Sequence, residues 1–219
     1  MTFARAIDGF AGTGESTVAK EVAKRFNLTY IDTGAMYRAV GLYIYLNNIS
    51  FDDEAVIINC LKNIKIYFDN DNIFLNNNNV TDAIRKNEIS DYASRIATYP
   101  AVRHKLVKMQ QELAENGRVI MEGRDIASHV LPNANIKIYL DASPEERARR
   151  RCNQLIEKGQ TAVYEDILKE TLIRDERDMT RVHAPLIKVS DAILVDTTNM
   201  TLGEGIEEII KIIGDVDVL

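Results

Sequence analysis

Residues 9–17 combine residue types and a spacing that suit phosphate binding. Gly9 and Gly14 stand five positions apart, and Ser16 and Thr17 follow them. Phosphate loops share the pattern G-x-x-x-x-G-K-[ST], in which glycines let the backbone curl so that its N–H groups point at phosphate oxygens. The hydroxyl of Ser16 is placed to hold Mg²⁺. The pattern predicts these loop residues as phosphate ligands: Gly9, Ala11, Gly12, Thr13, Gly14, Ser16 and Thr17.

Glu15 stands where that pattern has its lysine. A carboxylate in place of the cation reverses the local field, since one unit-charge contact at about 4 Å is worth about 4 kcal/mol at an effective dielectric of about 20. We expect the Glu15 side chain to lie on a solvent-lined loop. A plain turn between a strand and a helix is the alternative interpretation of the whole segment.

The surrounding pattern supports a loop between a strand and a helix. A short strand is predicted over residues 4–8, and Val18, Val22 and Phe26 recur every four residues, which predicts a helix over 16–26. Short apolar strands alternate with helices through the rest of the chain, which is typical of a parallel sheet covered on both faces. The further strands are expected at 29–31, 118–121, 136–140 and 192–195, and the further helices at 35–47, 84–98, 100–116, 144–158, 163–180 and 202–213.

One segment has a different periodicity. Ile64, Ile66 and Phe68 alternate with polar residues, and Ile73 and Leu75 follow after a polar turn. Alternation with period two around a turn predicts a β-hairpin. A small antiparallel sheet is therefore expected between helices.

Composition narrows the class of protein. The 219 residues include 27 basic and 33 acidic side chains, and the net charge of −6 argues against a general nucleic-acid binder. Cys60 and Cys152 are too few for a disulfide scaffold. No apolar run reaches the roughly 18 residues of a membrane span. Arg5 and Asp8 interrupt the stretch where a signal peptide would be apolar. We expect a cytoplasmic protein.

Four further blocks follow the loop in order. Together with Ile7-Asp8-Gly9 and the loop, they resemble the bacterial cytidylate kinases, within the nucleoside monophosphate kinases. The chain departs from the family pattern at three positions: Glu15 replaces a lysine, Phe10 stands where a proline is usual, and Glu122 replaces an aspartate and keeps its charge. The blocks are residues 32–38 (DTGAMYR), 122–125 (EGRD), 143–151 with 157–159, and 174–178 with Arg181 and 184–186.

The resemblance implies a fold and an activity. The fold is α/β, with a five-stranded parallel sheet and helices on both faces, as in P-loop kinases. The activity is ATP-dependent phosphorylation of CMP and dCMP, with Mg²⁺, by a monomer that has no nucleic-acid or membrane partner. The implied organisation is a core (residues 1–34, 103–151 and 181–219), a monophosphate-binding insertion with the small sheet (35–102), and a mobile lid (152–180).

The resemblance also assigns roles to residues. Arg38, Arg124 and Arg181 would hold the acceptor phosphate as the catalytic arginines. Some of the lid-entry arginines 147, 150 and 151 would reach ATP when the lid closes, and Arg147 and Arg151 are the predicted ligands. Arg149 is expected to face outward. A carboxylate can accept from the cytosine amino group, which suits Asp125. The substrate-binding set is Thr33, Tyr37, Arg38, Ser94, Arg103, Arg124, Asp125, Arg174, Asp178 and Arg181.

Two other functions remain open at this point. Glu15 motivates a non-catalytic nucleotide-binding protein of the same fold. The loop by itself is equally consistent with a kinase for another small acceptor, such as UMP, AMP or shikimate. For Arg174 and Asp178, which stand four apart in a predicted helix, a surface ion pair accounts for the spacing as well as ribose binding does.

Overall fold

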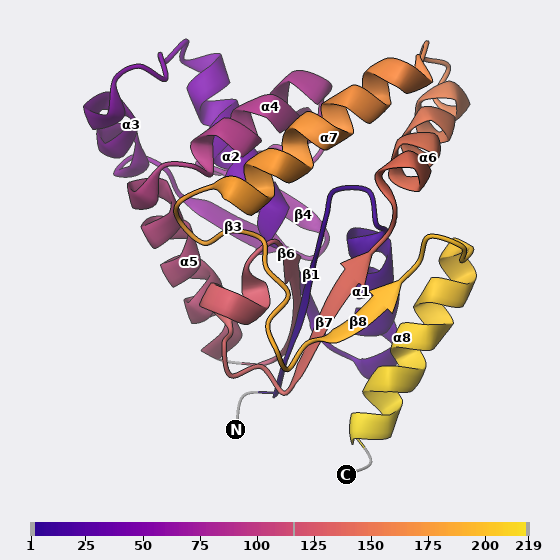
Figure 1. The fold of residues 1–219 in the computed structure, drawn as a ribbon. Coiled ribbons are helices and arrows are strands. Elements are labelled where there is room, and N and C mark those ends of the chain that lie inside the picture. The colour runs from indigo at the N-terminus through magenta and orange to yellow at the C-terminus, as the bar shows by residue number, and fades with distance from the viewer. Residues whose placement is uncertain (1–2, 116, 218–219) are drawn as a thin grey trace. The chain divides into compact units, whose positions relative to one another are not determined.

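A computed structural model describes residues 3–115 and 117–217 of the chain (Figure 1). The chain divides into two compact units. The first unit runs up to Ile31 and resumes at Leu113, and the second unit is Asp32–Glu112. The functional division into core, insertion and lid stays a prediction.

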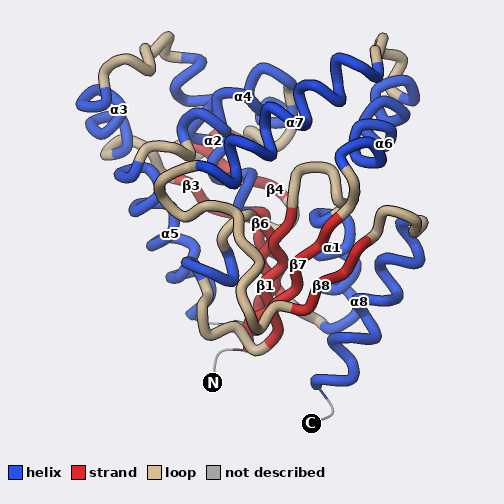
Figure 2. Tube along the Cα trace, viewed as in Figure 1, coloured by secondary structure: helices blue, strands red, loops and turns tan. Residues whose placement is uncertain are grey.

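The first unit is built on a five-stranded sheet in the order β2-β6-β1-β7-β8. Figure 2 shows its strands β6, β1, β7 and β8 next to one another. β1 is paired in parallel with β6 on one side and β7 on the other, and β7 is paired in parallel with β8. In the register of the sheet, Ile7 of β1 lies opposite Glu122 of β6 on one side and Ile138 of β7 on the other. The predicted α/β fold with a parallel sheet is confirmed. The strands are β1 (Phe3–Gly9), β2 (Thr29–Asp32), β6 (Arg118–Gly123), β7 (Ile136–Asp141) and β8 (Ile193–Asp196).

Helices flank this sheet because their apolar faces need a partner. Val18 and Val22 of α1 pack with Ile209 and Ile213 of α8 in the cluster that holds Ile7. The predicted start of α6 is confirmed, since Ser143 Oγ accepts a hydrogen bond from the Glu146 N–H at 3.2 Å. The helical elements are α1 (Glu15–Phe26), a single wide turn η2 (Ile126–Val130), α6 (Pro144–Glu157), α7 (Tyr164–Thr180) and α8 (Leu202–Asp217).

The second unit has its own core. Met36, Val40 and Ile44 of α2 are fully buried, and the predicted hairpin covers the same apolar cluster with Ile66 and Ile73. Left-handed asparagines form the hairpin's turns, with Asn70 between β3 and β4 and Asn76 after β4. The elements are α2 (Thr33–Leu46), α3 (Glu54–Leu61), β3 (Ile66–Asp69), β4 (Asn72–Leu75), β5 (Asn78–Asn79), η1 (Ala83–Arg85) and α4 (Asn87–Ile96); α5 (Pro100–Glu115) begins in this unit.

Two elements of the second unit differ from the sequence expectation. Helix α3 was not expected; it begins because Asp53 accepts from the Val56 N–H at 3.1 Å, and it buries Ile57 and Leu61. The single helix expected over 84–98 is instead η1 followed by α4, because Lys86 adopts an extended backbone (φ −65°, ψ 149°).

Within residues 3–115 and 117–217, no helix is both long enough and apolar enough to cross a bilayer.

Candidate functional site

The loop after β1 has the backbone of an anion-binding turn. Gly12 and Gly14 adopt positive φ values of 89° and 101°, which other residues rarely tolerate. A Cβ on Gly9 would lie 2.3 Å from the Leu140 carbonyl oxygen, so only glycine fits between β1 and β7. Gly14 is the N-cap of α1 and provides no side-chain cap. Gly14 therefore leaves the first-turn N–H groups of α1 uncapped by its side chain. An anion bound at a helix N-terminus needs such N–H groups as donors.

A cluster of oxygen atoms lies beside the loop. Ser16 Oγ donates a hydrogen bond to Glu122 Oε1 at 2.7 Å, and Tyr30 Oη donates to the same oxygen at 3.0 Å. Glu122 is buried at the end of β6, where parallel sheets bind ligands. Hydroxyl and carboxylate oxygens are the ligands that Mg²⁺ prefers, so this donor set fits that ion.

Glu15 is not on a solvent-lined loop, and that expectation was wrong. It is the first residue of α1 and is only 6% exposed. Both of its carboxylate oxygens accept from Arg124 Nη1 at 2.9 Å. Burial raises the pKa of Glu15 well above its ordinary value, and the charge of Arg124 opposes that shift. The side chain therefore forms a buried ion pair instead of meeting water.

Arg124 is shared between two carboxylates. Its Nε donates to Asp178 Oδ2 at 3.1 Å, while Nη1 meets Glu15. Burial acts to lower the Arg124 pKa, but the charges of Glu15, Asp178 and Glu122 outweigh it and the pKa is raised. Two residues that the sequence assigned to the acceptor, Arg124 and Asp178, are thus brought together, and Glu15 joins them.

The arginines of α6 contact the loop backbone. Arg147 is 2% exposed; its Nη1 lies 2.9 Å from Asp175 Oδ1 and donates to the Ala11 carbonyl at 3.2 Å. Arg150 Nη1 donates to the Thr13 carbonyl at 3.4 Å, and its Nη2 donates to the Thr197 carbonyl at 2.6 Å. These contacts fix the shape of the loop. Direct contact between Arg147 and ATP stays a prediction.

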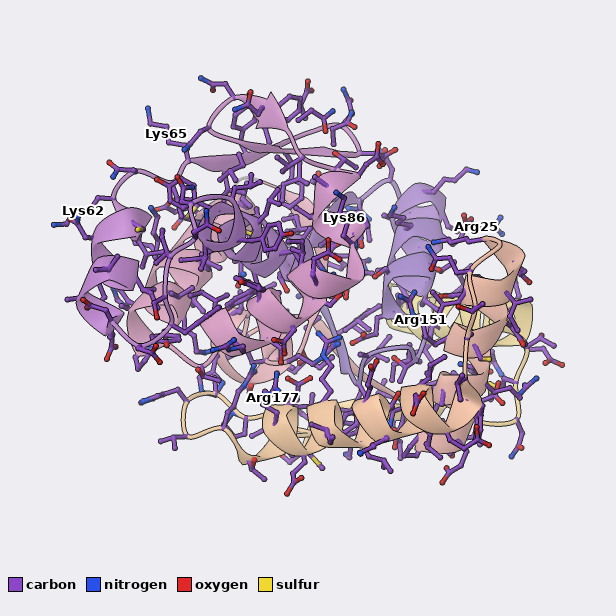
Figure 3. All side chains as sticks on the ribbon, turned by 90° about the horizontal axis from the view of Figure 1, so that it is seen from above. Arg25, Lys62, Lys65, Lys86, Arg151 and Arg177 are labelled. Atoms are coloured by element: carbon purple, nitrogen blue, oxygen red, sulfur yellow. The ribbon has the colours of Figure 1, made fainter. Side chains whose placement is uncertain are left out.

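The other two arginines of α6 differ in exposure. Arg149 faces outward as expected, with a side chain that is 64% exposed and an ion pair to Glu146 at 2.7 Å. Arg151 is half-buried, and Figure 3 shows it on α6, with Arg177 on α7.

Asp8 fixes the segment that follows Arg124. Its two carboxylate oxygens accept from the backbone N–H groups of Ile126 and Ala127, each at 2.7 Å. Burial raises the pKa of Asp8 to about 7, and those two hydrogen bonds act in the opposite direction. Asp125, directly before them, forms an ion pair of 3.7 Å with Arg181, whose Nε donates to the Ala184 carbonyl at 2.6 Å.

Arg174 of α7 lies close enough to Asp178 for the charge of that carboxylate to act on its pKa. Burial lowers its pKa, and in the part of the chain that the structure describes its Nε is buried without a hydrogen-bond partner. Asp178, four residues on, contacts Arg124. A simple surface ion pair between Arg174 and Asp178 does not describe these two residues.

The remaining candidates belong to the second unit. Arg38 Nη1 donates to Ser90 Oγ at 2.6 Å and to the Ile84 carbonyl at 3.2 Å. The Arg103 guanidinium lies 5.7 Å from the centre of the Tyr37 ring. Ser94 on α4 is buried, as is Thr33 at the start of α2.

Sequence reasoning missed several of these contacts. Asp8 and Tyr30 were given no role, and neither was the pair of Asp32 and Arg85 at 2.7 Å. A charged residue at the end of an apolar strand, as Asp8 is, is a usable signal, because buried charges are held by specific partners. Tyr30 offers no comparable signal in the sequence.

The comparisons with known proteins agree with this fold. A family model described as cytidylate kinase matches residues 5–215. The cytidylate kinase of Thermosipho melanesiensis is 49% identical over 208 residues, covering 95% of each chain. That of Fusobacterium nucleatum is 48% identical over 206 residues, covering 94% of each. The crystal structure of an uncharacterized protein from Eubacterium ventriosum shares the fold alone, with a TM-score of 0.52 at 14% identity over 98% of this chain and 99% of that one. On this evidence the chain belongs to the cytidylate kinase family.

Proposed function

We propose that this protein transfers the terminal phosphoryl group of ATP to CMP, and to dCMP, giving CDP or dCDP and ADP. The observation that carries the proposal is the family match over residues 5–215. It is supported by sequence identities of 49% and 48% to two cytidylate kinases along nearly the whole chain.

The donor would bind at the phosphate loop. Its left-handed glycines, Gly12 and Gly14, and the N-terminus of α1 support binding of a polyphosphate. Ser16 and Glu122 would hold Mg²⁺, directly or through water. When bound, Mg²⁺ would supply positive charge that offsets the negative charge developing during phosphoryl transfer.

The acceptor would be read by two groups of residues. Arg38, Arg124 and Arg181 supply positive charge for its phosphate, and Ser94, Arg103 and Asp125 supply donors and an acceptor for the edge of the cytosine base. Thr33, Tyr37, Arg174 and Asp178 complete the proposed set, the last two at the ribose.

The protein's own contribution to the reaction is positioning and charge. Phosphoryl transfer needs little covalent chemistry from side chains, so an enzyme accelerates it by alignment and by stabilising charge. Arg147 and Arg150 hold the loop carbonyls of Ala11 and Thr13, which orients the loop N–H groups toward the donor. Asp8 holds the backbone beside Asp125, which orients that carboxylate for the base.

Glu15 motivates one alternative, a nucleotide-binding protein that does not turn over, but the comparisons with cytidylate kinases do not favour it. The monomeric state, the absence of a nucleic-acid partner and the cytoplasmic location stay predictions.

CMP-dependent production of ADP tests the function. We expect ADP formation with CMP and dCMP, and little with AMP, GMP or shikimate under the same conditions. Tight CMP binding without ADP formation would establish the non-catalytic alternative. Equal turnover of all acceptors would remove the assignment to cytidylate.

A further inference from the structure

We propose that Glu15 is an internal counter-anion of Arg124 that competes with the acceptor's phosphate and so determines how much that phosphate contributes to binding. This inference rests on the proposed role of Arg124 in holding the acceptor phosphate. Its own evidence is the pair itself, in which Nη1 of Arg124 lies 2.9 Å from both oxygens of Glu15.

The charge around Arg124 is already compensated before any phosphate arrives. Arg124 Nη1 donates to Glu15 and Arg124 Nε donates to Asp178. Nη1 also donates to the Gly123 carbonyl at 3.1 Å. One guanidinium thus faces two carboxylates. A phosphate dianion that approaches it meets a guanidinium that already pairs with two carboxylates, so attraction is weakened.

Glu15 is poorly placed to withdraw. Its carboxylate lies beneath the backbone turn at Gly9, where a Cβ would approach Oε1 to 3.2 Å. The side chain is buried, and both of its oxygens accept from Arg124 Nη1. Because solvent does not screen a buried charge as it screens an exposed one, the carboxylate keeps its influence on Arg124.

The consequence is specific to charged ligands. Glu15 should reduce the affinity for CMP relative to cytidine, which carries the same base and ribose without the phosphate. A merely structural role for Glu15 would change the affinities for both ligands together. The ratio of the two affinities therefore isolates the competition from any effect on the shape of the site.

Calorimetric binding of CMP and cytidine, without ATP, tests the inference on the full chain and on Glu15→Gln. We expect Glu15→Gln to raise the ratio of CMP affinity to cytidine affinity at least about tenfold, which is about 1.4 kcal/mol. Glu15→Asp keeps the charge and should stay near the original ratio. Glu146→Gln is the matched control, because it removes a carboxylate that pairs with Arg150 at 2.8 Å elsewhere in the same unit. It should also leave the ratio unchanged.

Should Glu15→Gln fail to fold, Glu15→Met provides a second neutral and unbranched side chain for the same measurement. An unchanged ratio in a folded neutral variant that binds CMP overturns the inference and leaves the proposed function intact. A rise of equal size in Glu146→Gln also overturns it. Failure of every form to bind CMP overturns the inference together with the proposed function.

Discussion

The carboxylate of Asp8 on β1 accepts a hydrogen bond from the backbone N–H of Ile126, 118 residues later in the chain, at 2.7 Å. The neighbouring N–H of Ala127 is held at the same distance. The strand that leads into the phosphate loop is thereby tied to the segment that carries Arg124 and Asp125. A single buried carboxylate connects two parts of the proposed chemistry.

This arrangement predicts a pH dependence of stability. Burial raises the pKa of Asp8 from 3.8 to about 7, so between these values the folded protein holds a proton that the unfolded chain has released. Stability contributed by this group is therefore largest below about pH 4 and falls as pH rises to about 7. We expect the free energy of unfolding of the original protein, minus that of Asp8→Asn, to fall across this window in urea titrations.

The control for this prediction is Asp191→Asn. Its carboxylate is exposed, and a hydrogen bond from Lys137 lowers its pKa. Its removal should produce no such trend between about pH 4 and pH 7. A flat difference for Asp8→Asn over that window would contradict the prediction.

Replacing Glu15 with lysine should increase turnover. The lysine of a phosphate loop neutralises charge on the donor during transfer, and stabilisers of this kind are typically worth about 100-fold to 1,000-fold in kcat. We expect Glu15→Lys to exceed the original protein at least about 100-fold in steady-state ADP formation at saturating Mg²⁺. The protein's unfolding should be measured alongside, since Glu15 is buried and paired with Arg124.

If the two forms agree within about threefold in kcat, a loop lysine is not the principal source of charge stabilisation. An arginine of α6, such as Arg150 or Arg151, would then have to supply it. Glu15→Gln separates the two effects of this substitution, because it removes the negative charge without adding a positive one.

Asp125 should contribute to recognition of the base. We expect Asp125→Ala to weaken CMP binding by about 1–3 kcal/mol, because a polar group of the base loses its partner. The original protein should bind CMP more tightly than AMP or GMP, and the variant should lose part of that preference. Since Asp125 also faces Arg181 at 3.7 Å, Arg181→Lys provides the comparison for effects that act through the phosphate. Unchanged CMP affinity in Asp125→Ala would mean that other residues read the base.

The buried pair of Arg147 and Asp175 should dominate the stability of α6 against α7. Removing one partner leaves an uncompensated buried charge, which typically costs about 3–5 kcal/mol. We expect Asp175→Asn to lose about that much in the free energy of unfolding, measured with denaturant, and to raise the KM for ATP more than that for CMP. The second effect follows because Arg147 also holds the Ala11 carbonyl at 3.2 Å.

Arg149→Met is the control on the same helix. Its side chain is 64% exposed, and exposed ion pairs contribute little. A loss in Arg149→Met as large as that in Asp175→Asn would argue against the special role of the buried pair.

The fold was predictable where the signal is local. Glycine spacing at Gly9 and Gly14 placed the loop, and the serine-proline start of α6 placed that helix. The burial of Glu15 was not predictable, because its partner Arg124 lies 109 residues away and no local pattern joins them. Helix α3 was missed because its cap, Asp53, was not recognised among polar residues.

The candidate site was predictable in its residue types and less so in its contacts. The resemblance named Arg124, Asp178 and Arg147 as site residues. It did not indicate that Arg124 pairs with Glu15 as well as with Asp178. The contact of Arg147 with Asp175 depends on how α6 and α7 pack, which periodicity alone does not specify.

The asparagines in left-handed turns, in the hairpin and after two helices, affect the conformational entropy of the unfolded chain. Among the described residues, five of the six non-glycine positions with positive φ are asparagines: Asn27, Asn48, Asn70, Asn76 and Asn77. Glycine would adopt these conformations more easily, but it would also leave the denatured chain more freedom to lose on folding. The two effects are each about 1 kcal/mol and oppose one another. At these five positions asparagine thus provides a left-handed turn while keeping the denatured ensemble narrower than glycine would.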